Sequence, residues 1–221
     1  MGTYLGEPDA ATDRLVEEAI IKSVRSRACN VVDTAINYRF QRAERSVGRA
    51  VRLLVDINEV GREQVFISTK NGYLTHDAEP DMSFPEYVER HLIMSGVCAP
   101  SDIVGGIHCM KPAFLEDQLN RSLQNLRLET IDLIYLHNAA ESQLPYLGHS
   151  RFYEELREVF TFYEEMRKRG RIRFYGLATW SCFRTVLGAR DYLSLERVQI
   201  RPATLQPSYA RGGSATQPED R

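Results

Sequence analysis

The chain has 221 residues, of which 43% are hydrophobic, and its formal net charge is -2. A chain of this length can bury a sizeable core, and its charge offers no basic field for binding nucleic acid. No apolar run is long enough to cross a membrane, and the first residues contain no apolar signal-peptide core. We therefore expect a soluble globular protein with neither a nucleic-acid nor a membrane partner.

The cysteines are far apart and show no paired spacing of the kind that zinc sites use. In a chain of this length, such cysteines are typical of reduced thiols in a cytoplasmic protein. We expect this for all four, Cys29, Cys98, Cys109 and Cys182.

Helical and strand patterns alternate through the first third of the chain. Thr12 is the expected N-cap of a helix in which Val16, Ile20 and Val24 recur on one face. The pattern then predicts a short buried strand over 30–35, an amphipathic helix over 41–56 and a second strand over 64–70.

The segment that follows the second strand, about residues 71–112, is too long for an ordinary strand-to-helix loop. It contains Pro80, Pro85, Pro100 and the pair Gly105-Gly106. We expect an insertion that carries its own short helix around FPEYVERHL.

Strand and helix patterns alternate again after the insertion. A helix is predicted over 113–128, a strand over 131–137, a helix over 152–170 that Gly170 closes, and a strand over 172–179. Apolar strands that alternate with helices favour a parallel sheet covered by helices.

Two closures of such a sheet compete, a doubly wound sheet and a (β/α)₈ barrel of the TIM type. The doubly wound fold usually carries G-x-G-x-x-G after its first strand, and this sequence has none. In a barrel the active site lies at the C-terminal ends of the strands, where Asp33, Lys70 and His137 stand. We predict an incomplete barrel of about five to six strand-helix units over residues 1–196, followed by an irregular or disordered tail over 197–221.

The polar residues at these strand ends suggest a reaction. Any one of Asp33, Lys70 and His137 could equally be the first solvated residue of a loop. Together with Tyr38 they would form a set suited to carbonyl reduction. A phenol can protonate the alkoxide that hydride transfer leaves, and a nearby ammonium lowers the phenol's usual pKa of ~10. The carboxylate would hold the amine, and the imidazole would orient the carbonyl.

The motifs DTAINY, AERSVGRAV, FISTK, SLQNLRLETIDLIYLH and GRIRFYGLATW occur in this order over about residues 1–195. This set resembles the aldo-keto reductase family. The resemblance implies a (β/α)₈ barrel and an NADPH-dependent reductase acting on an aldehyde or ketone of a small molecule. It also implies a catalytic tetrad of Asp33, Tyr38, Lys70 and His137.

The resemblance implies four cofactor contacts, and one of their positions departs from the family pattern. Many members have Ser-Asn at the end of the fifth strand, where this chain has Ala178-Thr179-Trp180. If LQPSY matches the family's sixth strand, a glutamine and an aromatic residue would hold the nicotinamide; an unrelated tail is the favoured alternative. The implied contacts are Thr34, Thr179, Gln206 and Tyr209. The substrate and the choice between NADPH and NADH are left open.

His108 and Cys109, in the motif GGIHCM, raise the alternative of a metal-binding or reactive pair. A metal site needs more ligands than one adjacent pair. We expect no metal, and we expect these two residues to line or pack the wall of a pocket.

A parallel sheet that stops short of closure has unpaired edges and uncovered apolar residues. Three hypotheses follow: a truncated reductase, self-association through the unclosed barrel edges, and a shortened family member without turnover. In the third, the chain would be a binding or regulatory module on a barrel scaffold.

Overall fold

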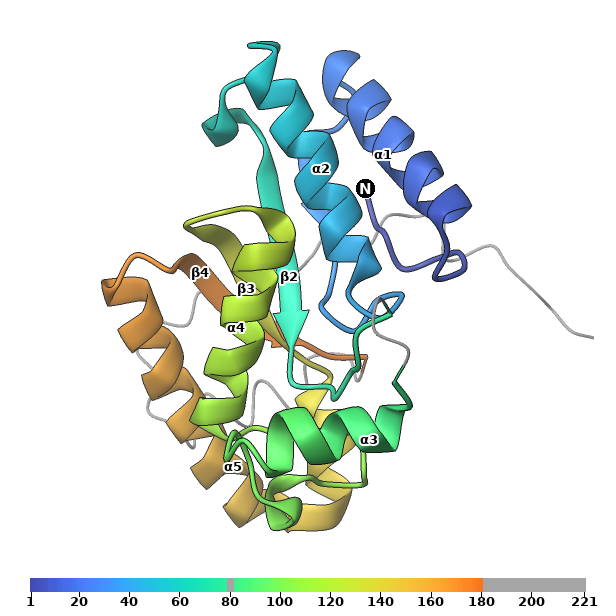
Figure 1. Ribbon diagram of the computed structural model, residues 1–221. Helices are drawn as coiled ribbons and strands as arrows, with labels where there is room; N and C mark the ends of the chain where they lie inside the picture. Colours follow the sequence, from blue (N-terminus) through green and yellow to red (C-terminus); the bar gives the residue numbers. More distant parts are fainter. Residues whose placement is uncertain (79–81, 181–221) are drawn as a thin grey trace, which may run out of the picture.

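Residues 1–78 and 82–180 are described by a computed structural model of the chain. Within these residues, four strands form one parallel sheet with the order β1-β2-β3-β4, of which Figure 1 labels the last three. Their order in space follows their order in the chain, as in a barrel, whereas a doubly wound sheet reverses direction at a switch point. The strands are β1 (Val31–Asp33), β2 (Phe66–Asn71), β3 (Ile131–His137) and β4 (Ile172–Ala178).

Helices connect these strands. The longer ones are α1 (Ala10–Arg25), α2 (Arg42–Asp56), α4 (Pro112–Leu126) and α5 (Ala139–Lys168). The insertion holds α3 (Phe84–Val88), which continues into a π-helical turn at Glu89–Ile93, and single 3₁₀ turns lie at Arg62–Gln64 and Pro100–Asp102. The short helix expected within the insertion is confirmed.

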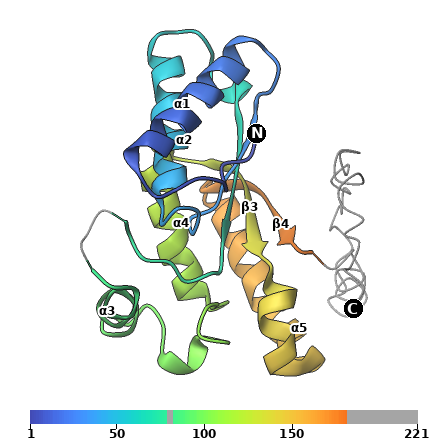
Figure 2. The same ribbon diagram turned by 90° about the vertical axis from the view of Figure 1, so that its right-hand side faces the viewer.

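Side chains that alternate along β2 show that α2, α4 and α5 cover one face of the sheet. Thr69 donates a hydrogen bond to Glu44 of α2, and the Asn71 side chain contacts the Leu115 carbonyl of α4 and Tyr163 of α5. Figure 2 shows these helices beside the strands, with α1 lying against α2. The apolar side chains on the inner faces of α2 and α4 are buried here, and each fully buried aliphatic side chain contributes about 1.5–3 kcal/mol.

The opposite face of the sheet holds apolar residues near the N-terminal ends of the strands. Val31 and Phe174 are about half exposed within the described part of the chain, and the Phe66 and Phe174 rings stack 6.5 Å apart. Self-association through the sheet remains a prediction, since no partner chain is described. The same holds for the tail and the remaining barrel units, because residues 181–221 lie outside the described ranges.

Two helix boundaries differ from the sequence prediction. Asp9, not Thr12, caps α1: its carboxylate accepts from the Thr12 backbone N–H, while the Thr12 hydroxyl accepts from Glu7. The last helix begins at Ala139 instead of residue 152, because two segments join across a kink at Gly148, whose φ is 70°. The first of these segments was not predicted, because Pro145 and Gly148 are unfavourable residues inside a helix.

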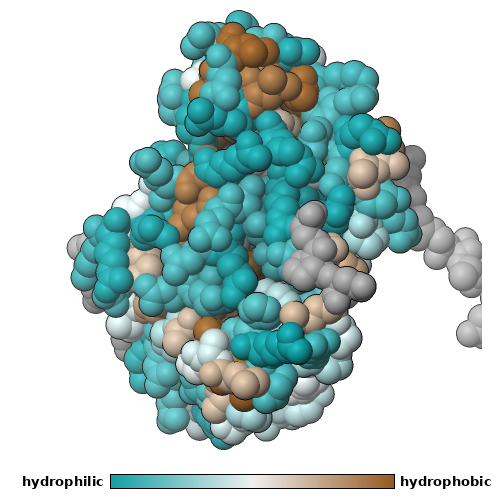
Figure 3. Space-filling view, viewed as in Figure 1, coloured by the Kyte–Doolittle hydropathy of each residue, from teal (hydrophilic) through white to brown (hydrophobic). Residues whose placement is uncertain are grey.

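No helix in the described ranges is both long and apolar enough to pass through a membrane. The face shown in Figure 3 is largely hydrophilic, with a hydrophobic patch near the C-terminal end of α2, where Leu53 and Ile57 are partly exposed.

Candidate active site

The C-terminal ends of β1 and β2 meet in a partly buried ion pair. Lys70 Nζ donates to Asp33 Oδ2 at 2.6 Å and to the Thr34 carbonyl at 2.7 Å. Ser68, which pairs with Asp33 in the sheet, donates to the other carboxylate oxygen at 2.7 Å. The Lys70 side chain is 9% exposed and that of Asp33 is 41% exposed, so the amine depends on this pairing more than the carboxylate does.

Tyr38 lies in the loop between β1 and α2, where Lys70 Nζ stands 4.9 Å from the centroid of its ring. The next three residues all adopt left-handed backbone conformations, with φ between 50° and 72°. Such backbone is unfavourable for non-glycine residues and persists only when neighbours hold it. One contact that stabilises this backbone is the buried ion pair of Arg39 with Asp13 of α1, at 2.7 Å.

His137, the last residue of β3, faces the same volume. Its ring centroid lies 5.8 Å from that of Tyr38 and 4.9 Å from that of Tyr73, with both pairs close to perpendicular. Its Nδ1 is buried and has no hydrogen-bond partner within the described residues. The structure therefore brings Asp33, Tyr38, Lys70 and His137 together at one end of the sheet.

Two of the four cofactor contacts expected from the sequence, Thr34 and Thr179, lie within the described residues. Thr34 is completely buried, with its backbone carbonyl on Lys70. Thr179 directly follows Ala178, the β4 partner of His137, and its hydroxyl donates to Glu141 Oε1 at 2.7 Å. Gln206 and Tyr209 lie outside the described residues.

The sequence model described as "Aldo/keto reductase family" matches residues 1–212. The chain belongs to the aldo/keto reductase family. No curated protein matches it in a sequence search.

Several solved aldo-keto reductases share this fold. An aldo-keto reductase of Bacillus halodurans in its holo form matches with a TM-score of 0.52 and 20% identity, covering 81% of this chain and 45% of that one. A glycerol dehydrogenase of Gluconobacter oxydans matches with a TM-score of 0.50 and 21% identity, covering 86% and 47%. An aldo/keto reductase of Klebsiella pneumoniae in complex with NADP and acetate gives 0.50 and 21%, covering 82% and 45%. The chain thus spans about half the length of these structures.

One electrostatic expectation is wrong in this family member. Burial, with smaller contributions from Asp33 and Tyr4, raises the pKa of Tyr38 to about 12, where the sequence predicted a lowered value. Burial also lowers the pKa of Lys70, and Asp33 opposes that effect. The Lys70 ammonium lies over the Tyr38 ring, and its hydrogen bonds within the described residues go to Asp33 and to the Thr34 carbonyl.

Burial favours the neutral form of both buried histidines of the chain. Burial, with Lys70 and His108 adding to it, lowers the pKa of His137 to about 3, and burial lowers that of His108 to about 4. Neither ring should carry charge near neutral pH.

We expect this to make the chain sensitive to mild acid. Below about pH 6.5 these rings take up protons in the unfolded chain, whereas in the folded chain they do so only at about pH 3–4. Their contribution to stability is therefore fully present above pH 6.5 and decreases as the pH falls. The free energy of unfolding should drop by about 2–5 kcal/mol between pH 7 and 4.5 in urea titrations. His108→Gln should remove about half of this drop, because His137 still titrates. A flat wild-type profile would contradict this account.

Sequence reasoning missed the surroundings of His137, chiefly Tyr73, Ser142 and Gln143. Only the GGIHCM motif drew attention to this region. Cys109 is buried in the core, and burial raises its pKa to about 12, which disfavours a reactive thiolate. Within the described ranges, no group of three or more His, Cys, Asp or Glu residues could hold a metal.

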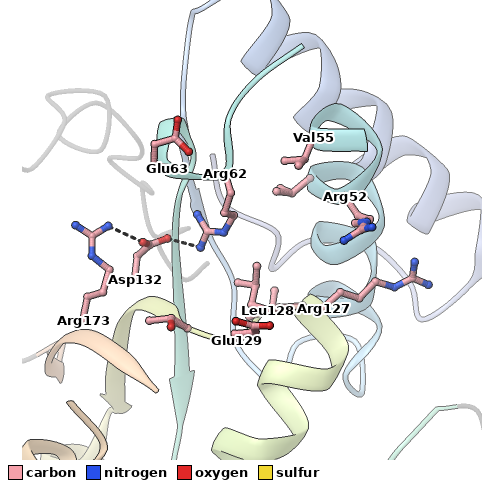
Figure 4. Close-up of a pocket in the computed structure, with 12 residues that line it drawn as sticks. Arg52, Val55, Arg62, Glu63, Arg127, Leu128, Glu129, Asp132 and Arg173 are labelled. Carbon is pink, nitrogen blue, oxygen red and sulfur yellow. Dashed lines mark hydrogen bonds and ion pairs between the residues drawn. The ribbon is translucent and has the colours of Figure 1, made fainter. Parts of the chain in front are cut away.

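A cleft of about 490 Å³ lies at the opposite end of the strands (Figure 4). There Asp132, near the start of β3, accepts hydrogen bonds from Arg62 at 2.7 Å and Arg173 at 2.9 Å. Because these cations are already paired with Asp132, the cleft gives no evidence of a second reaction centre.

Proposed function

We propose that the chain reduces an aldehyde or ketone of a small molecule with NADPH. The proposal rests on the placement of an ammonium 4.9 Å from the Tyr38 ring centroid, with the His137 imidazole 5.8 Å from the same ring. Three ionisable groups around one small volume are an arrangement suited to proton transfer to a carbonyl oxygen.

Each group has a distinct role in this proposal. A bound nicotinamide cofactor would supply the hydride. Tyr38, whose raised pKa keeps it protonated, donates its proton to the developing alkoxide, which is a much stronger base than a phenolate. Lys70 stabilises the tyrosinate that remains, and Asp33 keeps the amine charged. The neutral His137 orients the carbonyl oxygen.

The end of β4 suits the nicotinamide end of such a cofactor. Thr179 directly follows Ala178, which pairs with His137 in the sheet, so it lies at the same end of the sheet as the proposed catalytic residues. We propose Thr179 as the carboxamide contact. Thr34, being fully buried, would support Lys70 through its carbonyl. The Klebsiella pneumoniae structure in complex with NADP supports the choice of cofactor.

Trp180, the only tryptophan, offers a direct binding test because it follows Thr179 and is 82% exposed. NADPH should quench its fluorescence. Thr179→Val should weaken the NADPH affinity measured by this quenching about five- to tenfold, which is the usual contribution of one hydrogen bond. Quenching together with NADPH oxidation in the presence of carbonyl compounds would support the reductase. Folded protein that does neither would refute it.

The second candidate is a cofactor-sensing or regulatory module. It is favoured by the departure from the family pattern at Ala178-Thr179-Trp180, where the Thr179 hydroxyl and the Trp180 backbone N–H both donate to Glu141. Quenching by NADPH without oxidation, across a wide panel of carbonyl compounds, would favour this module.

A further inference from the structure

The His108 ring is completely buried and held at both of its nitrogens. Nε2 lies 2.9 Å from the backbone carbonyl oxygen of His137, and Nδ1 lies 2.9 Å from the Gln143 amide nitrogen. A carbonyl oxygen can only accept, so Nε2 carries the proton and Nδ1 accepts from Gln143. The contacts therefore fix one neutral tautomer, which donates to the last residue of β3.

The backbone around His108 is shaped to admit this ring. Gly72 has a φ of 117°, and a Cβ added there would lie 2.6 Å from His108 Nε2. Backbone hydrogen bonds from Cys109 to Gly72 at 2.9 Å and from Leu74 to Ile107 at 2.8 Å fasten this part of the insertion to the end of β2. These two backbone hydrogen bonds hold the segment that carries His108 next to the end of β2.

Tyr73 packs between the two histidines. Its ring meets His108 edge-on at 5.1 Å and His137 at 4.9 Å, and its hydroxyl accepts from Ser142 of α5 at 2.9 Å. A catalytic imidazole is usually oriented by the hydrogen bond at its other nitrogen. Within the described chain His137 Nδ1 has no such partner, so its orientation depends on its backbone and on these packed rings.

We propose that His108 is a positioning residue, which anchors the His137 backbone through its Nε2–H and so keeps the His137 ring against Tyr38. Gln143 sets the His108 tautomer, and Tyr73 fills the space between the two rings. This proposal rests on the proposed reductase function, because it assigns His108 a role in orienting the carbonyl through His137. Loss of the anchor should slow the chemical step and leave NADPH binding intact.

Two substitutions separate positioning from simple packing. His108→Leu removes the donor, and we expect kcat to fall about 10- to 100-fold, the range that a misplaced catalytic group produces. His108→Gln places an amide N–H near the former Nε2, and it should recover most of kcat. Trp180 quenching should give the same NADPH affinity in both variants. Equal losses in the two variants would overturn the proposal.

A matched control is Tyr163→Phe, which also loses a buried side-chain hydrogen bond, to Asn71, but does not touch His137. It should lose stability and keep the wild-type kcat. A fall in kcat equal to that of His108→Leu would show that destabilisation alone explains the result.

Nitrogen NMR of the histidine rings tests the anchor without any turnover. Wild-type His108 should show a protonated Nε2 and an unprotonated Nδ1, and His108→Leu should shift or broaden the His137 ring signals. A protonated Nδ1, or unchanged His137 signals in His108→Leu, would overturn the proposal. If wild-type protein oxidises no NADPH, the reductase function fails, and these spectra still decide whether His108 anchors His137.

Discussion

Replacing Tyr38 with phenylalanine should lower the rate of carbonyl reduction by at least about 100-fold, the lower end of what a positioned proton donor contributes. The ring remains, so its contact with the Lys70 ammonium and its packing against Tyr4 and His137 should survive. Only the proton donor is lost. NADPH oxidation should therefore nearly vanish, while Trp180 quenching and the urea midpoint stay close to wild type.

Tyr146→Phe is the control for this substitution, because it makes the same chemical change at an exposed position on α5. It should leave NADPH oxidation unchanged. If Tyr38→Phe kept wild-type kcat, another group would be the acid, and the role given to Tyr38 would be wrong.

The second large effect concerns the Asp33–Lys70 pair, whose two partners should not be equally costly to replace. Asp33→Asn leaves a buried ammonium without its counter-charge and should cost about 1–3 kcal/mol of unfolding free energy. Lys70→Met leaves a carboxylate that is partly exposed and still accepts from Ser68, so the cost should be smaller. Both should lower kcat by about 100-fold. Lys70→Met removes the ammonium that stabilises the tyrosinate, and Asp33→Asn removes the carboxylate that holds this ammonium in place.

Urea unfolding at pH 7 measures this asymmetry. The exposed Arg52–Asp56 pair of α2 provides the matched control, where Asp56→Asn should cost no more than about 1 kcal/mol. Equal costs for Asp33→Asn and Lys70→Met would mean that the ammonium is better solvated than its burial indicates.

Periodicity and strand ends predicted most of the described fold. Parallel strands place their C-terminal ends at one edge, so Asp33, Lys70 and His137 could be grouped from their positions behind apolar runs. Boundaries that depend on single contacts were harder. The Asp9 cap requires one hydrogen bond to Thr12, and the kink of α5 depends on the backbone at Gly148.

The electrostatics of the site could not be predicted in the same way. Residue types placed an ammonium near a phenol, but burial depends on packing, and it raises the pKa of Tyr38 above its ordinary value. The contacts that position His137 could not be predicted either, because they involve Gly72, His108 and Gln143 from three separate segments of the chain. The sequence marked only the adjacent His108 and Cys109, and it gave no sign that the ring faces a backbone carbonyl.

The most direct test follows the hydrogen itself. The purified chain would be incubated with NADPH that carries deuterium at the transferable position of the nicotinamide and with a panel of aldehydes and ketones, and the alcohols would be analysed by mass spectrometry and NMR. The proposed function predicts one deuterium on the former carbonyl carbon with the wild type, and at most a trace with Tyr38→Phe. Folded wild-type protein that yields no deuterated alcohol from any carbonyl compound would contradict it.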